Sequence, residues 1–214
     1  MLKRRIGSAF VVIGAVLILS ALLLLLYNEN ESRNAGAASD AALSILQEAM
    51  TDYQLSIDEA PTNPTESASE PSETIPEPTE LTYVEINGHT YIGYLSIPTF
   101  ELDLPIMGSL SGEKLQIAPC LQYGSPLSDD AVIAGHNYKH HFLPLHDIVE
   151  GEQVYFVDMS GYVIEYSVSS VKTVNPTSVD EVVESEHDLV LYTCTTGGQA
   201  RVAVFCDRTE LPKG

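Results

Sequence analysis

Two kinds of side chain in this sequence could carry out nucleophilic and acid–base chemistry: its three cysteines and its six histidines. Among the cysteines, Cys194 ends the apolar run 189–194 and lies shortly before Gly197-Gly198, a pair typical of tight hairpin turns. A two-residue turn at these glycines would pair Cys194 with Arg201 on the next strand. Directly paired residues share a face, with Cβ atoms about 5 Å apart. We therefore expect a guanidinium group beside the thiol.

That pairing suits a cysteine nucleophile. A nearby cation favours the thiolate, which is the reactive form, and the donors of an arginine could stabilise an oxyanion at an attacked carbonyl. The same register turns Cys206 to the opposite, inward face of the hairpin, together with Thr193. Cys206 is therefore predicted to pack in the core and not to act as the nucleophile.

A cysteine enzyme of this kind needs a group that protonates the leaving amine, and His136 is the best candidate. It follows the apolar run 131–134 in the segment Ala134-Gly135-His136-Asn137. A strand end would hold the ring in place, and the glycine would let a substrate backbone approach. The remaining histidines lie in turn-like or loop segments: His89, His140, His141, His146 and His187.

The elements that must position these residues are short strands. Residues 82–86 and 90–97 flank Asn87-Gly88, a strong hairpin signal, and similar pairs of apolar runs flank Ser160-Gly161 and Gly197-Gly198. Only short helical turns are expected, near 142–149 and 179–185. This pattern predicts an all-β fold over residues 81–214: a closed β-barrel of about eight strands with short helices.

The N-terminal segment predicts a membrane anchor. Residues 6–27 form an uncharged, aliphatic run of 22 residues, and about 20 helical residues cross a bilayer. The run is too long for the apolar region of a cleaved signal peptide, and a poor cleavage site follows it. The bases Lys3, Arg4 and Arg5 precede it, so residues 1–27 are expected to be a cytoplasmic tail and single-pass transmembrane anchor, with the rest of the chain extracellular.

Between anchor and barrel, residues 28–80 carry twelve acidic residues and one base, Arg33. We expect a juxtamembrane helix over 35–56, serving as a spacer or packing loosely, and then a disordered, proline-rich stalk over 58–80 that lifts the domain off the membrane. The net charge of the whole chain is −20. Such an acidic protein is not expected to bind nucleic acid.

The reactive segments resemble those of the sortase family. The run Leu189–Cys194, the following Arg201 and the strand end Ala134–Asn137 are similar to the three active-site segments of sortases, in the same order of His, Cys and Arg. Upstream, Gly93–Pro98 is similar to the start of the sortase barrel, so the resemblance covers roughly residues 90–208. The segment Gly-His-Asn-Tyr, followed by Phe142, is closer to class B or D members.

The resemblance implies a membrane-anchored cysteine transpeptidase without a cofactor or metal. It would cleave a Leu-Pro-x-Thr-Gly-like sorting signal of another surface protein through a Cys194 thioester. His136 would protonate the leaving amine, and Arg201 would stabilise the oxyanion. An amine from a peptidoglycan precursor or a pilin lysine would then resolve the thioester. The resemblance further implies substrate-binding roles for Thr193, Thr195 and Asn137.

Other functions remain open from the residues alone. One is a different exported cysteine hydrolase of cell-wall peptides, although the papain-like type places Cys before His in the chain. Another is a non-catalytic surface binder or a sortase substrate. A metal site at His136, His140 and His141 is conceivable, but no Cys or carboxylate in that loop completes a tetrahedral set.

The two other cysteines pose a separate question. In an exported protein, Cys120 and Cys206 could form a disulfide, which would leave Cys194 as the one free thiol. The alternative is that both are buried free thiols.

Overall fold

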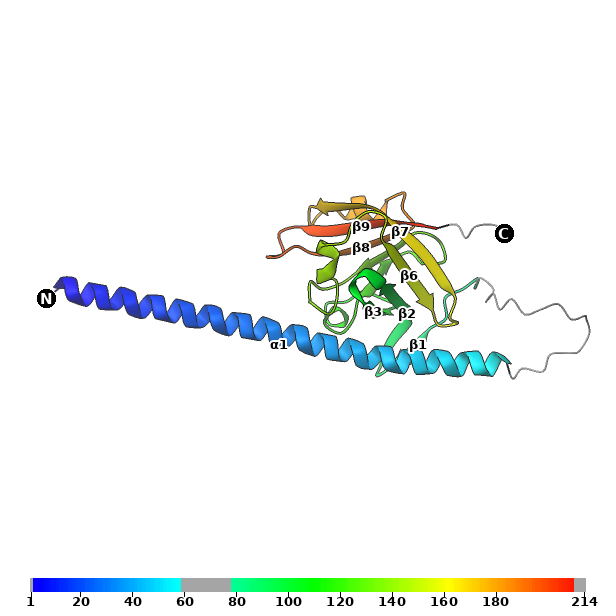
Figure 1. Ribbon diagram of the computed structural model, residues 1–214, viewed down its shortest axis with the longest axis horizontal. Helices are drawn as coiled ribbons and strands as arrows, with labels where there is room; N and C mark the ends of the chain where they lie inside the picture. Colours follow the sequence, from blue (N-terminus) through cyan, green and yellow to red (C-terminus); the bar gives the residue numbers. More distant parts are fainter. Residues whose placement is uncertain (1, 59–77, 210–214) are drawn as a thin grey trace, which may run out of the picture.

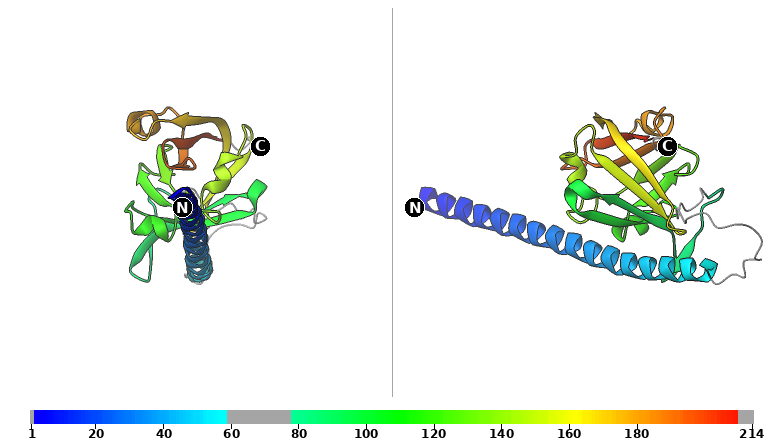
Figure 2. Two further views of the ribbon diagram at one scale, coloured as in Figure 1. Left: turned by 90° about the vertical axis from the view of Figure 1, so that its left-hand side faces the viewer. Right: turned by 45° about the vertical axis from the view of Figure 1, so that its right-hand side comes forward.

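The computed structural model describes residues 2–58 and 78–209. One long helix, α1 (Leu2–Asp58), extends well past a compact β-barrel that packs on its C-terminal half (Figures 1 and 2). The strands are β1 (Val84–Ile86), β2 (His89–Ile97), β3 (Leu102–Met107), β4 (Cys120–Tyr123), β5 (Ala131–Ala134), β6 (Gln153–Asp158), β7 (Val163–Val174), β8 (Leu189–Cys194) and β9 (Arg201–Arg208). The short helices are η1 (Pro98–Phe100), η2 (Lys114–Gln116), η3 (Leu143–His146) and α2 (Val179–Val183).

Eight strands close into a ring, so the predicted barrel is confirmed. The order is β2-β3-β4-β5-β8-β9-β7-β6, and β6 pairs back on β2, while β1 is added to β2 as a hairpin. The predicted hairpin turn at Asn87-Gly88 is present, with φ angles of 53° and 79°. Two of the pairings are parallel, β3 with β4 and β5 with β8. The second of these matters for the site.

The barrel interior is one apolar cluster that includes Leu189, Leu191, Val204 and Cys206. Their alternation along β8 and β9 follows the period of two expected for strands with one buried face. The outer face of the same strands is partly covered by a smaller cluster built around Val190 and Phe205 with residues of β5, β7 and α2.

Helix α1 does more than the spacing expected of a juxtamembrane helix. Ala42, Leu46 and Met50 are buried, and they share a cluster with β1, β2 and β3 residues such as Tyr91 and Met107. The helix therefore packs along the barrel, and it continues the apolar segment as one helix that includes the expected juxtamembrane range 35–56. The cause is the apolar stripe at i, i+4 and i+8, which this sheet edge needs in order to be covered. Most of the predicted stalk, 59–77, lies outside the described residues.

The N-terminal half of α1 stands clear of the barrel. The large apolar side chains of residues 10–27 are exposed, Leu24 and Leu26 at 67% each. Among the described residues, α1 is the one helix long and apolar enough to cross a membrane. An apolar surface of this size on a protein marks a site that another apolar phase covers.

Candidate active site

The hairpin of β8 and β9 places Cys194 opposite Arg201, as the glycine pair predicts. The turn itself differs from the expected two-residue form. Gly198 N donates to Thr195 O at 2.7 Å, so the tight turn is centred on Thr196 and Gly197. Gly197 and Gly198 both have positive φ, 89° and 74°, which explains why glycine occupies them. The register survives because Thr195 N donates to Ala200 O at 2.9 Å.

The thiol of Cys194 is half-buried and free. Its own backbone carbonyl faces η3, where His146 Nε2 lies 3.1 Å from Cys194 O and donates to it in the tautomer protonated at Nε2. This contact braces the end of β8 from outside the hairpin. Sequence reasoning missed it, because His146 is 48 positions away and only its place in a predicted helical turn was apparent.

The guanidinium group of Arg201 was expected beside the thiol, and it is bound to the hairpin turn. Its Nη1 donates to Gly198 O at 3.1 Å and to Ala200 O at 3.0 Å. The backbone of Arg201 is thus fixed opposite Cys194, while one guanidinium nitrogen, Nη1, is engaged with carbonyls of its own loop.

His136 reaches the same end of the barrel through the parallel pairing of β5 with β8. Ala134 pairs with Tyr192, and Gly135 N donates to Tyr192 O at 3.0 Å. Two residues farther along each chain are His136 and Cys194, so the parallel pairing brings both to the same end of two neighbouring strands. The three predicted residues therefore lie at the ends of three adjacent strands, β5, β8 and β9.

Close packing explains the glycine before this histidine. A Cβ at Gly135 would lie 2.4 Å from Cδ2 of Phe142, which packs directly on the backbone there. Phe142 N also donates to His136 O at 3.1 Å. The loop therefore folds back on itself and holds the His136 backbone.

The electrostatic environment of His136 contains two opposing influences. Burial lowers the pKa of its imidazole, and the nearby carboxylate of Glu31 raises it. Burial is the larger cause, so the neutral ring is favoured at neutral pH.

The three predicted substrate-binding residues lie around this strand end but differ in orientation. Thr193 is 1% exposed and points into the barrel, as its register implies. Thr195 Oγ1 accepts a hydrogen bond from Ala200 N at 3.0 Å, so its side chain shapes the turn. Asn137 has a buried Oδ1 with no hydrogen-bond partner among the described residues.

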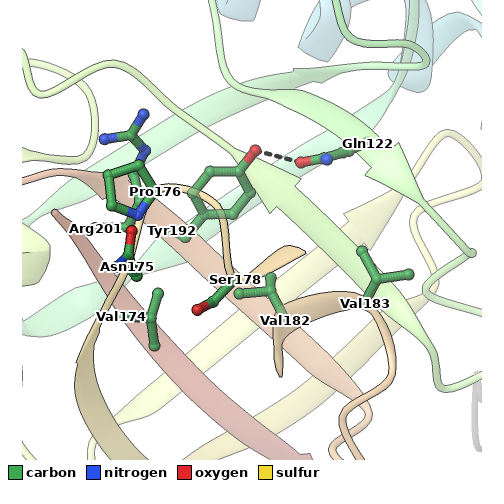
Figure 3. Close-up of a pocket in the computed structure, with 9 residues that line it drawn as sticks. All are labelled: Gln122, Val174, Asn175, Pro176, Ser178, Val182, Val183, Tyr192 and Arg201. Atoms are coloured by element: carbon green, nitrogen blue, oxygen red, sulfur yellow. Dashed lines mark hydrogen bonds between the residues drawn. The ribbon is translucent and has the colours of Figure 1, made fainter. Parts of the chain in front are cut away.

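A cavity of about 130 Å³ opens beside the hairpin on the Cys194 face. Figure 3 shows Arg201 near Asn175 and Pro176 of the loop after β7, with Tyr192 in the centre and Val182 of α2 below it. The Tyr192 hydroxyl donates to Gln122 Oε1, which fixes the ring that lines the cavity. This volume is below the roughly 300 Å³ of a pocket for a whole drug-sized ligand, so it suits one part of a longer substrate.

The other two cysteines are free, so the hypothesis of a disulfide between Cys120 and Cys206 is wrong. Cys206 lies in the barrel interior and Cys120 in the cluster under α1, so the two lie in different parts of the core. Burial raises the pKa of Cys120 to about 11, and it also raises that of Cys206. Neither thiol forms the reactive thiolate readily, and Cys194 is the one cysteine of the chain that is not buried.

Within residues 2–58 and 78–209, no three His, Cys, Asp or Glu side chains converge as metal ligands would. His136, His140 and His141 accordingly do not form such a group.

Comparison with solved structures places the barrel among known enzymes. Sortase C2 of pilus island 1 from Group B Streptococcus is 26% identical, with a TM-score of 0.51, over 59% of this chain and 77% of that one. Sortase C1 of Streptococcus agalactiae is also 26% identical, with a TM-score of 0.51, over 56% and 70%. Sortase C of Clostridium perfringens SM101 is 19% identical, with a TM-score of 0.51, over 86% and 99%, and shows the fold alone.

No curated protein sequence gives a significant match to the chain. The resemblance to class B or D stays a prediction, because the structures named above are class C sortases at low identity. The family model of the sortase domain matches residues 95–209, more than half of the 214 residues, and spans every strand that carries the candidate site. The chain therefore belongs to the sortase family of cysteine transpeptidases.

Proposed function

We propose that the protein cleaves a Leu-Pro-x-Thr-Gly-like sorting signal and transfers the acyl part to an amine, with Cys194, His136 and Arg201 as its catalytic residues. The observation that supports the proposal is the adjacency of β5, β8 and β9, whose neighbouring ends carry these residues. Family membership supplies the reaction class.

In the first half-reaction, the Cys194 thiolate attacks the scissile carbonyl carbon, and the negative charge moves to the carbonyl oxygen. Arg201 donates to that oxygen through the guanidinium donors that Gly198 and Ala200 do not engage. The carbon–nitrogen bond then breaks, and the leaving amine takes a proton from the His136 imidazolium. The product is a thioester on Cys194 and a neutral His136.

In the second half-reaction, an acceptor amine attacks the thioester carbonyl and gives its proton to His136. The carbon–sulfur bond breaks, an amide forms, and the thiolate and imidazolium are restored. The acceptor is an amino group of a peptidoglycan precursor or a pilin lysine. Burial of His136 favours its neutral form, which suits this proton acceptance.

The cavity beside Arg201 is proposed to hold part of the sorting signal on the acyl side. Its walls are about equally polar and apolar, and the apolar part comes from Val174, Pro176, Val182 and Val183. An apolar wall next to the oxyanion donor suits the Leu-Pro portion of the signal. Asn137, with its unpaired buried Oδ1, is proposed as a contact to the substrate backbone.

Residues 1–27 are proposed to anchor the protein in the cell membrane with the N-terminus inside. The exposed apolar surface of α1 supports an anchor, and Lys3, Arg4 and Arg5 before it support the orientation. Added protease should digest the barrel on intact protoplasts. Protection until the cells are lysed would contradict the orientation.

The test of the activity uses the full chain in detergent micelles with a peptide that contains the sorting signal. We expect mass spectrometry to detect an acyl adduct on Cys194, and an added amine to divert the product from hydrolysis to a new amide. Cys194→Ala should form neither product, while Cys120→Ala should retain both. An adduct on another cysteine, or hydrolysis that an amine never diverts, would favour the alternative, an exported cysteine hydrolase of cell-wall peptides.

A further inference from the structure

The loop that carries His136 is covered by helix α1, the same helix that bears the apolar segment. Lys139 N donates to Ser32 Oγ of α1 at 3.2 Å. One turn later, Gly36 packs directly on His140, and a Cβ at position 36 would lie 2.9 Å from Cβ and Cγ of that histidine. The helix therefore approaches the loop as closely as glycine permits.

The next loop residue is enclosed as well. His141 is fully buried, and the carbonyls of Ala35 on α1 and Ile117 face its ring. Burial, together with the neighbouring His136, lowers the pKa of His141 to about 4. This ring is thus neutral at neutral pH and adds no charge between α1 and the loop.

At the edge of this contact, Glu31 faces Tyr138. The carboxylate acts as an acceptor for the Tyr138 hydroxyl, and with burial as the larger cause it raises the pKa of that phenol. The Tyr138 ring lies against the His136 ring, with centroids 4.7 Å apart and an interplanar angle of 35°. A continuous chain of contacts therefore joins α1 to the imidazole.

We propose that Glu31 of α1 is a positioning residue of the active site, which holds the His136 ring through Tyr138. The inference rests on the proposed function in one respect, the role of His136 as acid and base. Glu31 never touches the substrate; it fixes the ring plane by fixing Tyr138, and its negative charge favours the imidazolium that the first half-reaction consumes.

The position of Glu31 on α1 also relates the membrane anchor to the active site. Glu31 lies four residues after Tyr27, the end of the apolar run, which is about 6 Å along the helix axis at 1.5 Å per residue. Figure 1 shows the turn between β8 and β9 directed toward the N-terminal half of α1, so the reactive end of the barrel faces the anchor. The anchor helix thus supplies part of the active site as well as attachment.

The groups that face His136 come from three elements. Glu31 comes from α1, Tyr138 and His141 come from its own loop, and Cys194 lies at the neighbouring strand end. Among these groups, the Glu31 carboxylate raises the pKa of His136. Removal of its charge therefore has a defined sign: the His136 pKa falls, and the limb of a pH profile that reports it moves to lower pH.

The test compares Glu31→Gln, Glu31→Asp and Tyr138→Phe in the full chain in micelles, with kcat/KM for the sorting peptide measured across pH. We expect Glu31→Gln to lower kcat/KM about threefold to tenfold, or roughly 1 kcal/mol of transition-state stabilisation. The His136 limb should move to lower pH, and Glu31→Asp should restore most of the rate. Tyr138→Phe should lower kcat/KM to a similar extent but move the limb less, because the Glu31 charge remains. The matched control is Glu29→Gln, because Glu29 pairs with Arg33 on the exposed side of the same helix.

A second readout keeps this inference separate from the proposed function. Nuclear magnetic resonance titration of His136 in the inactive Cys194→Ala chain reports its pKa without catalysis. A lower pKa with Glu31→Gln supports the inference, whereas an unchanged titration and pH profile overturn it and leave the function intact. Full activity of His136→Ala would instead overturn the assigned role of His136.

Discussion

The proposed active site has two halves that are held in different ways: a hairpin half with Cys194 and Arg201, and a loop half with His136. Cys194 and Arg201 are fixed by the ladder of a single hairpin, with partners close in sequence. His136 lies beyond the end of β5, on a loop that is clamped between the barrel and the N-terminal helix. The proposed nucleophile is therefore built into the barrel, while the proposed acid and base, His136, depends on a contact between two distant parts of the chain.

Substitutions should therefore affect the two halves differently: backbone pairing sets the geometry of the hairpin half, whereas contacts set the position and pKa of His136. A hairpin register changes only when strands slip, which would turn every side chain to the wrong face. A loop under a helix can shift by smaller steps, so His136 is the residue whose position and pKa respond to substitutions far from the barrel. The four predictions below test this division, from the largest expected effect on turnover at neutral pH to the smallest.

In the hairpin half, Arg201→Ala should lower kcat by about 100- to 1000-fold, the usual cost of losing an oxyanion donor. Arg201→Lys should recover little, because a lysine lacks the planar fork. Steady-state kinetics with the sorting peptide measure both. Lys172→Ala, which removes a cation over Phe205 on the same sheet, is the control and should change kcat little. A kcat for Arg201→Ala within tenfold of wild type would contradict the assigned role.

In the loop half, Gly36→Val should lower kcat/KM about tenfold, because a side chain there collides with His140 and pushes the loop away from α1. Overpacking of this kind costs about 1–3 kcal/mol in stability. Gly14→Val lies on the same helix, where a Cβ meets nothing within 4 Å, and should leave activity unchanged. Equal activity of the two variants would show that the helix does not position His136.

The apolar part of the helix contact should behave differently. Leu46→Ala removes a fully buried side chain from the cluster under α1 and should destabilise the fold by about 2–4 kcal/mol. Its kcat/KM under folding conditions should change less than about threefold, since Leu46 lies about four turns beyond Glu31. Chemical denaturation and peptide kinetics give the two values, with the exposed Ile45→Ala as control. A larger loss of activity than for Gly36→Val would contradict the division.

His141→Phe should have the smallest effect on turnover at neutral pH and a visible effect on acid stability. Burial lowers the pKa of His141 in the folded protein to about 4, below its ordinary value of 6.5. The unfolded chain therefore takes up a proton first, and wild-type stability falls as the pH drops from 6.5 toward 4. Urea denaturation at several pH values should show a shallower fall for His141→Phe. An identical fall in stability for both proteins would show that His141 does not contribute to the acid sensitivity of the wild type.

The hairpin half was predictable because its signals are local. The alternation of apolar residues on both sides of Gly197-Gly198 defines the register, and the expected pairing of Cys194 with Arg201 is confirmed. The centre of the turn was wrong by one residue, since the extra bonds between Thr195 and Ala200 are not encoded in the glycine pattern. The closed barrel was likewise predictable from many short strands without long amphipathic helices.

In the loop half, only His136 itself was predictable, as a candidate residue. The neighbourhood of His136 depends on the parallel pairing of β5 with β8 and on α1, both far away in sequence. Ser32, Gly36 and Glu31 carry no apolar signal, and a single acidic residue in an acidic segment is typical of exposed surface. The roles of these small and charged residues are apparent only from their contacts in the folded protein.

The resting contacts of Arg201 hold its guanidinium group on the turn. Its Nη1 donates to the carbonyls of Gly198 and Ala200, while Nε and Nη2 make no hydrogen bond among the described residues. A charged oxygen is a stronger acceptor than a neutral carbonyl, so these remaining donors gain most from an oxyanion that develops beside the turn. We expect the anchored guanidinium to offer them without first breaking a hydrogen bond, which preorganises the arginine for the charge of the transition state.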